Sequence, residues 1–257
     1  MIDAKALLGR LESSALLFSA VHRYGGGADT SRRVFVNLVH AGAVVIEIGA
    51  NQGIYTALFS RLVGRTGQVH AFEPVSSSFE RLLARVHSLG ATNISACQMA
   101  VADGSVSERE IIIPGADSEQ ASLVRHTAAS WASSTQTRSE LVQVTSLDAY
   151  LRKHDISHVD FVKLDVEGAE LSVLQSGREC FTRQKPVLHL EIESEWLHDF
   201  GATAHDLFQL LRSYGYKLAY RVDAKRLKGF CRIAESEYSA LLSKRVSGDF
   251  LFSVWPL

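Results

Sequence analysis

The sequence has few cysteines and no excess charge of either sign. Its 257 residues include three cysteines, Cys97, Cys180 and Cys231, and no CxxC pair, which argues against a disulfide framework and against a cysteine zinc site. Lysine and arginine number 27 against 28 aspartates and glutamates, so no overall field favours nucleic acid or an acidic membrane. We therefore expect a cytoplasmic protein with no nucleic-acid partner.

Long apolar runs are also absent. No stretch reaches the roughly 20 residues that a transmembrane helix needs, and the acidic residues before the apolar run at 15–21 are unlike the start of a signal peptide. We expect no membrane span. With 46% hydrophobic residues, the chain is long enough to bury one sizeable α/β core.

We expect two parts along the chain. Residues 1–30 read as a helical extension that ends in a glycine-rich hinge, and residues 31–257 as one domain. Within that domain, residues 114–139 are rich in Ala, Ser and Thr and form a long loop, which is often functional when it exceeds about 15 residues. It could act as a lid, with Ser122, His126 and Trp131 facing the substrate, although a surface loop explains it equally well.

A strand, a tight turn and a helix are predicted over residues 43–56. The turn reads Glu47-x-Gly49-x-Asn51-x-Gly53, in which glycines let a ligand approach the backbone and Asn51 tolerates a left-handed conformation. The dinucleotide pattern G-x-G-x-x-G is missing. A carboxylate beside the turn would repel a pyrophosphate but would accept hydrogen bonds from an ammonium group, which favours S-adenosylmethionine over NAD.

The next predicted strands end in acidic residues. Gln68–Phe72 ends in Glu73-Pro74, and Glu73 lies about 20 residues after the last glycine, the spacing of a ribose-binding acid. A helix is expected over Ser76–Leu89. Asn93–Val101 is expected to be the third strand and is followed by Ala102-Asp103.

Two later strands bring further charge to the same edge. Val159–Asp165 would bury Lys163 and Asp165, which is costly unless they pair. Glu167 and Glu170 could equally serve as helix-start residues. Pro186–Glu193 places His189, Glu191 and Glu193 on one face, with His189 more consistent with a core residue. A divalent metal on Asp165, Glu191 and Glu193 is a weaker interpretation, because no ligand spacing supports it.

Three segments, IGANQGIYT, AFEP and VDFVKLDVEGAELSVLQSG, together resemble the FkbM family of S-adenosylmethionine-dependent methyltransferases. The resemblance covers residues 44–193 and departs at Glu47, where the family more usually has Asp. It implies a class I methyltransferase of Rossmann-like fold, a seven-stranded, mostly parallel sheet with helices on both faces. It also implies O-methylation of a hydroxyl on a sugar, polyketide or other secondary metabolite.

The resemblance and the motifs together assign the site residues. Lys163, Asp165 and Glu193 are the expected catalytic residues. The resemblance implies that Asp103 accepts a hydrogen bond from the adenine amino group, although an Asp-Gly pair is also a common turn. The expected cofactor-binding residues are Glu47, Gly49, Ala50, Asn51, Gly53, Tyr55, Glu73, Pro74, Ala102, Asp103 and Asp165.

Two rival functions remain open from the sequence. An NAD(P)-dependent oxidoreductase would have the same kind of sheet and the same ribose-binding acidic residue. A non-catalytic S-adenosylmethionine-binding protein could have the same fold without catalysing a reaction. The expected partner is a small hydroxylated acceptor, and a homo-oligomer is left open.

Overall fold

The computed structural model describes residues 30–115, 120–127, 131, 137–234, 236–237 and 245–257. The expected N-terminal helix and hinge lie outside the described residues, apart from residue 30. Parts of the expected lid, at 116–119, 128–130 and 132–136, lie outside them as well. Among the described residues, no helix is both long and apolar enough to cross a bilayer.

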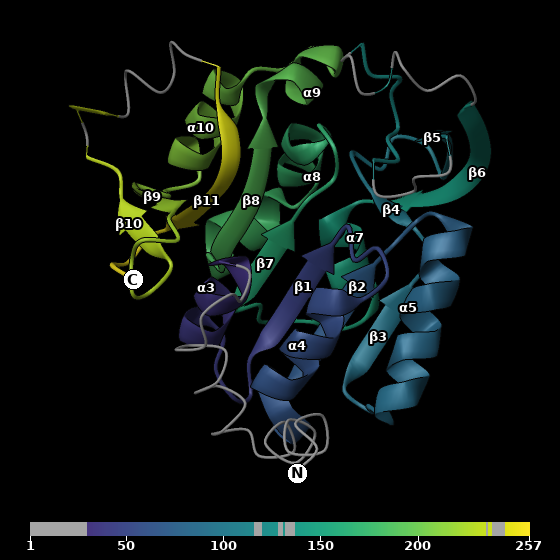
Figure 1. The fold of residues 1–257 in the computed structure, drawn as a ribbon, viewed down its shortest axis with the longest axis horizontal. Coiled ribbons are helices and arrows are strands. Elements are labelled where there is room, and N and C mark those ends of the chain that lie inside the picture. Colours follow the sequence, from purple (N-terminus) through teal and green to yellow (C-terminus); the bar gives the residue numbers. More distant parts are fainter. Residues whose placement is uncertain (1–29, 116–119, 128–130, 132–136, 235, 238–244) are drawn as a thin grey trace, which may run out of the picture.

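The described residues form an eight-stranded main sheet in the order β10-β9-β11-β8-β7-β1-β2-β3 (Figure 1). Its members are β1 (Val44–Ile48), β2 (Gln68–Phe72), β3 (Ile94–Cys97), β7 (Phe161–Leu164), β8 (Val187–Glu193), β9 (Leu218–Val222), β10 (Phe230–Arg232) and β11 (Ser247–Ser253). The strands from β8 to β3 run parallel, whereas β11 and β10 pair antiparallel with their neighbours. The expected α/β sheet is confirmed. The main sheet has eight strands where seven were expected, and the additional strand is β10, whose three residues are too few to show a periodic pattern.

Helices cover both faces of this sheet (Figure 1). One face carries α3 (Thr30–Leu38), α4 (Ile54–Val63) and α5 (Ser76–Leu89), and the other carries α7 (Leu147–Lys153), α8 (Glu170–Ser176) and α10 (Ala204–Ser213). The two-residue repeat of β1 explains how both faces are filled, since Val45 packs with α3 and α4 while Ile46 and Ile48 pack in the cluster that includes α7, α8 and α10. Shorter elements are η1 (Gly64–Thr66), η2 (Cys180–Gln184) and α9 (Ser194–Asp199).

A second, three-stranded sheet corrects the expected third strand. The backbone N–H of Met99 donates to the carbonyl of Cys97, and this turn ends β3. The chain resumes as β4 (Ala100–Val101), which pairs with β6 (Thr137–Thr145), and β6 pairs in turn with β5 (Glu108–Pro114). The single strand expected over 93–101 is therefore wrong. No glycine or proline marks the break, so local sequence does not reveal it.

Four parallel strands bring their carboxyl ends to one edge. In register, Ile48 of β1 lies between Phe72 of β2 and Leu164 of β7, and Leu164 lies beside Leu190 of β8. The residues that follow these positions therefore share one rim, which is where ligands bind in open α/β sheets.

Candidate active site

The turn after β1 is closely packed between the ends of two other strands. Gly49 and Ala50 both donate their N–H groups to the carbonyl of Phe72. Gly49 has a φ of 82°, and a Cβ there would lie 1.8 Å from the carbonyl oxygen of Asp165. Asn51 adopts a left-handed φ of 46°, as its side chain permits. Glycine is therefore required at position 49 by both conformation and space.

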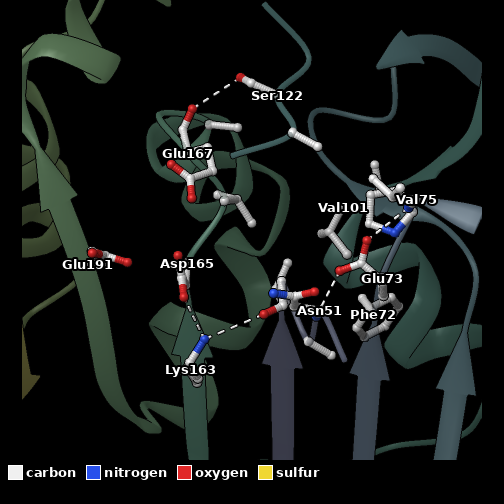
Figure 2. Close-up of a pocket in the computed structure, with 18 of the residues that line it drawn as sticks. Asn51, Phe72, Glu73, Val75, Val101, Ser122, Lys163, Asp165, Glu167 and Glu191 are labelled. Atoms are coloured by element: carbon white, nitrogen blue, oxygen red, sulfur yellow. Dashed lines mark hydrogen bonds and ion pairs between the residues drawn. The ribbon is translucent and has the colours of Figure 1, made fainter. Parts of the chain in front are cut away.

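Glu73 stands one strand away and is held by the turn itself. Its carboxylate accepts hydrogen bonds from the N–H of Asn51 at 2.8 Å and from the N–H of Val75 at 2.9 Å. Burial raises the pKa of Glu73 to about 7 in spite of these bonds. Figure 2 shows this carboxylate beside Asn51 and Val101 at the cavity.

A cavity of about 430 Å³ joins these groups to the ends of β7 and β8. Its lining includes the turn residues 48–52, Tyr55, residues 72–75 and residues 99–101. On the side of β7 and β8 it is lined by Lys163, Asp165, Val166, Glu167, Ala169 and Glu191, and the lining also includes Arg32, Ile54, Ile111, Ala121, Ser122 and Leu123. The volume is within the range of small-molecule sites.

Lys163 and Asp165 form an ion pair at the floor of this cavity. The Lys163 ammonium lies 2.9 Å from a carboxylate oxygen of Asp165 and donates to the carbonyl of Gly49 at 3.5 Å (Figure 2). Its side chain is 3% exposed and lies over the Tyr55 ring at 5.3 Å. Burial opposes the charge on both partners, yet their attraction raises the pKa of Lys163 and holds the pKa of Asp165 below its usual range. The expected pairing of these two residues is present.

Two further carboxyl groups face the same space. Burial, the negative charge of Asp165 and a hydrogen bond to Asp165 raise the pKa of Glu191 to about 9. Burial and the charges of Asp165 and Glu191 raise the pKa of Glu167 to about 10. At neutral pH both are therefore protonated, and Asp165 is the ionised member of the group.

Glu47 lies beneath the turn and is absent from the cavity lining. Its side chain is 0% exposed and accepts a hydrogen bond from the Thr56 hydroxyl of α4 at 2.6 Å. Burial raises the pKa of Glu47 to about 7, although the Lys163 charge and the Thr56 bond oppose this rise. The carboxyl group is therefore tied to α4 and interacts electrostatically with Lys163, and Glu47 is not among the residues that line the cavity.

The structure places other predicted residues away from the cavity. Asp103 follows β4, outside the cavity lining, and pairs with Arg109 at 2.9 Å. Glu193 accepts a hydrogen bond from the Ser247 hydroxyl of β11, and it does not line the cavity. The reasons are the break before β4 and the pairing of the end of β8 with β11. Ala102 and Gly53 are also outside the lining, whereas Pro74 and Tyr55 belong to it.

Of the three residues expected to face the substrate from the loop at 114–139, one lines the cavity and two do not. Ser122 lines the cavity, but His126 and Trp131 do not. Both residues are buried, at 4% and 1% exposure, and their rings pack against each other at 5.0 Å. Arg32, Met99 and Val101 line the cavity without having been predicted from the sequence, because they come from α3 and from the unexpected turn and strand.

Glu170 has the helix-start role that its position indicated. It is the first residue of α8, and its carboxylate accepts from the N–H groups of Val166 and Gly168. Glu167 lies before the helix and has a left-handed φ of 54°. Within the described residues, no group of three or more His, Cys, Asp or Glu side chains is arranged to hold a metal ion, so a metal on Asp165, Glu191 and Glu193 gains no support.

Comparison with known proteins identifies the family. The model of the methyltransferase FkbM domain matches residues 47–218. No curated protein matches the chain. The fold is similar to that of the crystal structure of methyltransferase FkbM from Methylobacillus flagellatus KT, with 16% identity, a TM-score of 0.50, and coverage of 93% of this chain and 50% of that one. The chain thus spans half the length of that relative.

Two further solved structures match this chain with lower TM-scores. A fibrillarin from Aeropyrum pernix in complex with S-adenosyl-L-methionine is 12% identical over 95% of this chain and 76% of its own, with a TM-score of 0.47. A putative methyltransferase from Streptococcus mutans in complex with SAH is 7% identical over 87% of this chain and 94% of its own, with a TM-score of 0.48. The family model matches well over half of the chain, and the chain therefore belongs to the FkbM methyltransferase family.

Proposed function

We propose that this protein transfers a methyl group from S-adenosylmethionine to a hydroxyl group of a small molecule. The observation that carries the proposal is the shared cavity of the Gly49 turn, Glu73 and the Lys163–Asp165 pair. A ribose-binding acid and an ionised carboxylate thus face one space. Family membership favours a sugar, polyketide or other secondary metabolite as the acceptor.

The residues fit the proposed cofactor in their chemistry. The carboxylate of Glu73 would accept the ribose hydroxyls, and the cavity-lining backbone of residues 49–51 would contact the aminoacyl end. Residues 99–101 would line the adenine in place of Asp103, because they face the cavity and Asp103 does not. When bound, S-adenosylmethionine supplies an electrophilic methyl group on a sulfonium.

The chain must then align the acceptor hydroxyl and take its proton. Asp165 is the group for this role, because it is ionised and is held in place by Lys163. Glu191 replaces Glu193 as its partner in the proposal, since Glu191 lines the cavity with Asp165 and the charge of Asp165 helps to raise the pKa of Glu191. Glu191 would orient Asp165 and the hydroxyl as a donor.

Calorimetric titration with S-adenosylhomocysteine tests the cofactor, with NAD titrated in parallel for the oxidoreductase alternative. A screen of hydroxylated sugars and polyketides, read by mass spectrometry for a gain of one methyl group, tests the reaction. Asp165→Asn should lower turnover by about 10² or more, the range for loss of a general base, and the surface variant Asp103→Asn should not. Tight NAD binding without S-adenosylhomocysteine binding would overturn the proposal, and cofactor binding without any methylated product would favour a non-catalytic binding protein.

A further inference from the structure

One backbone carbonyl at the cavity wall receives two side-chain hydrogen bonds from a distant segment. The Ser122 hydroxyl donates to the carbonyl of Glu167 at 3.1 Å (Figure 2), and Nε2 of His126 contacts the same oxygen at 3.0 Å. Glu167 has a left-handed φ of 54°, which is unfavourable for a residue with a Cβ. The two bonds therefore hold the chain in a conformation that it would not adopt alone.

The other ring nitrogen of His126 anchors the ring to the end of α9. Nδ1 lies 3.0 Å from a carboxylate oxygen of Asp199. The two contacts hold both ring nitrogens, one at the Asp199 carboxyl and the other at the Glu167 carbonyl. Asp199 also accepts from the N–H and the hydroxyl of Thr127, and these bonds help to keep its pKa below the usual range against the effect of burial. His126 and Asp199 thus form a buried pair that fixes the orientation of the ring.

Aromatic rings enclose this pair. The His126 side chain is 0% exposed and stacks on Trp196 of α9 at 5.6 Å, with Trp131 at 5.0 Å and Phe200 at 6.2 Å. Gly168, in the turn after β7, lies tightly against α9, because a Cβ there would lie 2.7 Å from the carbonyl of Trp196. The turn after β7 therefore packs between α9 and residues 122–126.

The side chain of Glu167, in this turn, faces the cavity. Glu167 lines the cavity near Asp165 (Figure 2), and its Oε2 is buried without a hydrogen-bond partner in the described part of the chain. An acid in that setting gains most from a positively charged ligand. The proton transfer assigned to Asp165 does not require Glu167, so the side chain is available for such a ligand.

We propose that His126 is a positioning residue that, anchored by Asp199 and assisted by Ser122, holds the Glu167 carboxyl at the reactive end of the cavity. Glu167 there releases its proton to solvent when the ligand binds, and the resulting carboxylate recognises the positive charge of the sulfonium. Residues 120–127 therefore contribute to the site by fixing the position of Glu167, in addition to covering the cavity. This inference rests on the proposed function, because it assumes that the cavity takes S-adenosylmethionine.

The test compares two ligands that differ in charge at the reactive centre, so no acceptor is needed. S-adenosylhomocysteine is neutral at sulfur, whereas sinefungin carries a C–NH₃⁺ group where the cofactor has S⁺–CH₃. Calorimetry gives the ratio of their dissociation constants. We expect the wild type to prefer sinefungin by about tenfold or more, and Glu167→Gln to remove most of that preference, as for a partly buried charge pair.

His126→Ala should reduce the preference as Glu167→Gln does, while the affinity for S-adenosylhomocysteine changes by less than about threefold. His126→Gln, which keeps a donor for the Glu167 carbonyl, should restore part of it, and Ser122→Ala should cause a smaller loss. The matched control is His198→Ala, an exposed histidine of α9. A purely structural role would lower the melting temperature of the His126 variants and leave the ratio unchanged.

The outcomes separate the two proposals. If neither ligand binds the wild type, the proposed function fails. If both ligands bind and the ratio is equal in the wild type, Glu167→Gln and the His126 variants, the inference is overturned while the proposed cofactor stands. If His126→Ala does not fold, His126→Gln and Ser122→Ala decide, since an unchanged ratio in both also overturns the inference.

Discussion

Replacing Glu47 by glutamine should stabilise the protein at alkaline pH. The carboxyl is fully buried, and its pKa rises from 4.5 to about 7 on folding. A tenfold change in a protonation equilibrium corresponds to about 1.4 kcal/mol, so ionised Glu47 costs the native state about 3 kcal/mol. Glutamine is neutral at every pH and keeps an oxygen that can accept the Thr56 hydrogen bond.

The sign of the pH dependence follows from which state loses its proton first. Below pH 4.5 the Glu47 carboxyl is protonated in both states and has no effect on the free energy of unfolding. Between 4.5 and about 7 the unfolded chain ionises first, so stability falls as pH rises; above about 7 the whole penalty is present. Two-state titration with these values gives a loss of about 2.5 kcal/mol between pH 5 and pH 8.

Urea unfolding followed by far-UV circular dichroism at pH 5 and pH 8 measures this loss. The wild type should lose about 2.5 kcal/mol more than Glu47→Gln over this interval. Glu80→Gln, which neutralises an exposed carboxylate of α5, should follow the wild type. Equal losses in Glu47→Gln and the wild type would refute the reasoning, because the buried carboxyl would then not be the group that titrates.

Four other outcomes are expected. Gly49→Ala should abolish binding of S-adenosylhomocysteine and lower the melting temperature, because its Cβ would overlap the carbonyl of Asp165; unchanged melting and binding would contradict the geometry of the turn. Glu73→Gln should weaken binding about tenfold by removing a charged acceptor, and an unchanged calorimetric affinity would remove the residue from the ribose site. Asp103→Ala should leave the affinity unchanged, because Asp103 pairs with Arg109 outside the cavity lining, and a large loss would restore its adenine role. Binding of S-adenosylmethionine at pH 8 should release protons from cavity carboxyls, seen in calorimetry in buffers of different ionisation enthalpy; proton uptake would contradict the charge argument.

Local sequence predicted the features that depend on neighbours along the chain. The helix expected over Ser76–Leu89 has those bounds, and Gly90 ends it with a left-handed φ of 58°. The strand, turn and helix around Asn51 are equally local, since each conformation follows from residue type and position. The pairing of Lys163 with Asp165 was also predictable, because a covered strand cannot bury an isolated charge.

Features set by distant partners were not predictable in this way. The orientation of Glu193 depends on Ser247, which is 54 residues later. The contact of His126 with Asp199 spans 73 residues and is not part of any periodic pattern. Local propensity contains no information on such contacts, so the expected catalytic Glu193 lies outside the cavity lining while Glu191 is part of it.

The charge of the cavity bears on which cofactor the glycine turn would accept. Four carboxyl groups line it against two cationic side chains, Arg32 and Lys163. Burial is the largest cause of the raised pKa values of Glu73, Glu167 and Glu191, and the charge of Asp165 adds to it for Glu167 and Glu191. A ligand with two negative phosphates, such as NAD, would oppose the ionisation of these carboxyls and would be repelled by Asp165. S-adenosylmethionine, with a sulfonium, an ammonium and one carboxylate, has a net positive charge that would favour their ionised forms, and this supports the proposed cofactor by an argument separate from the motif.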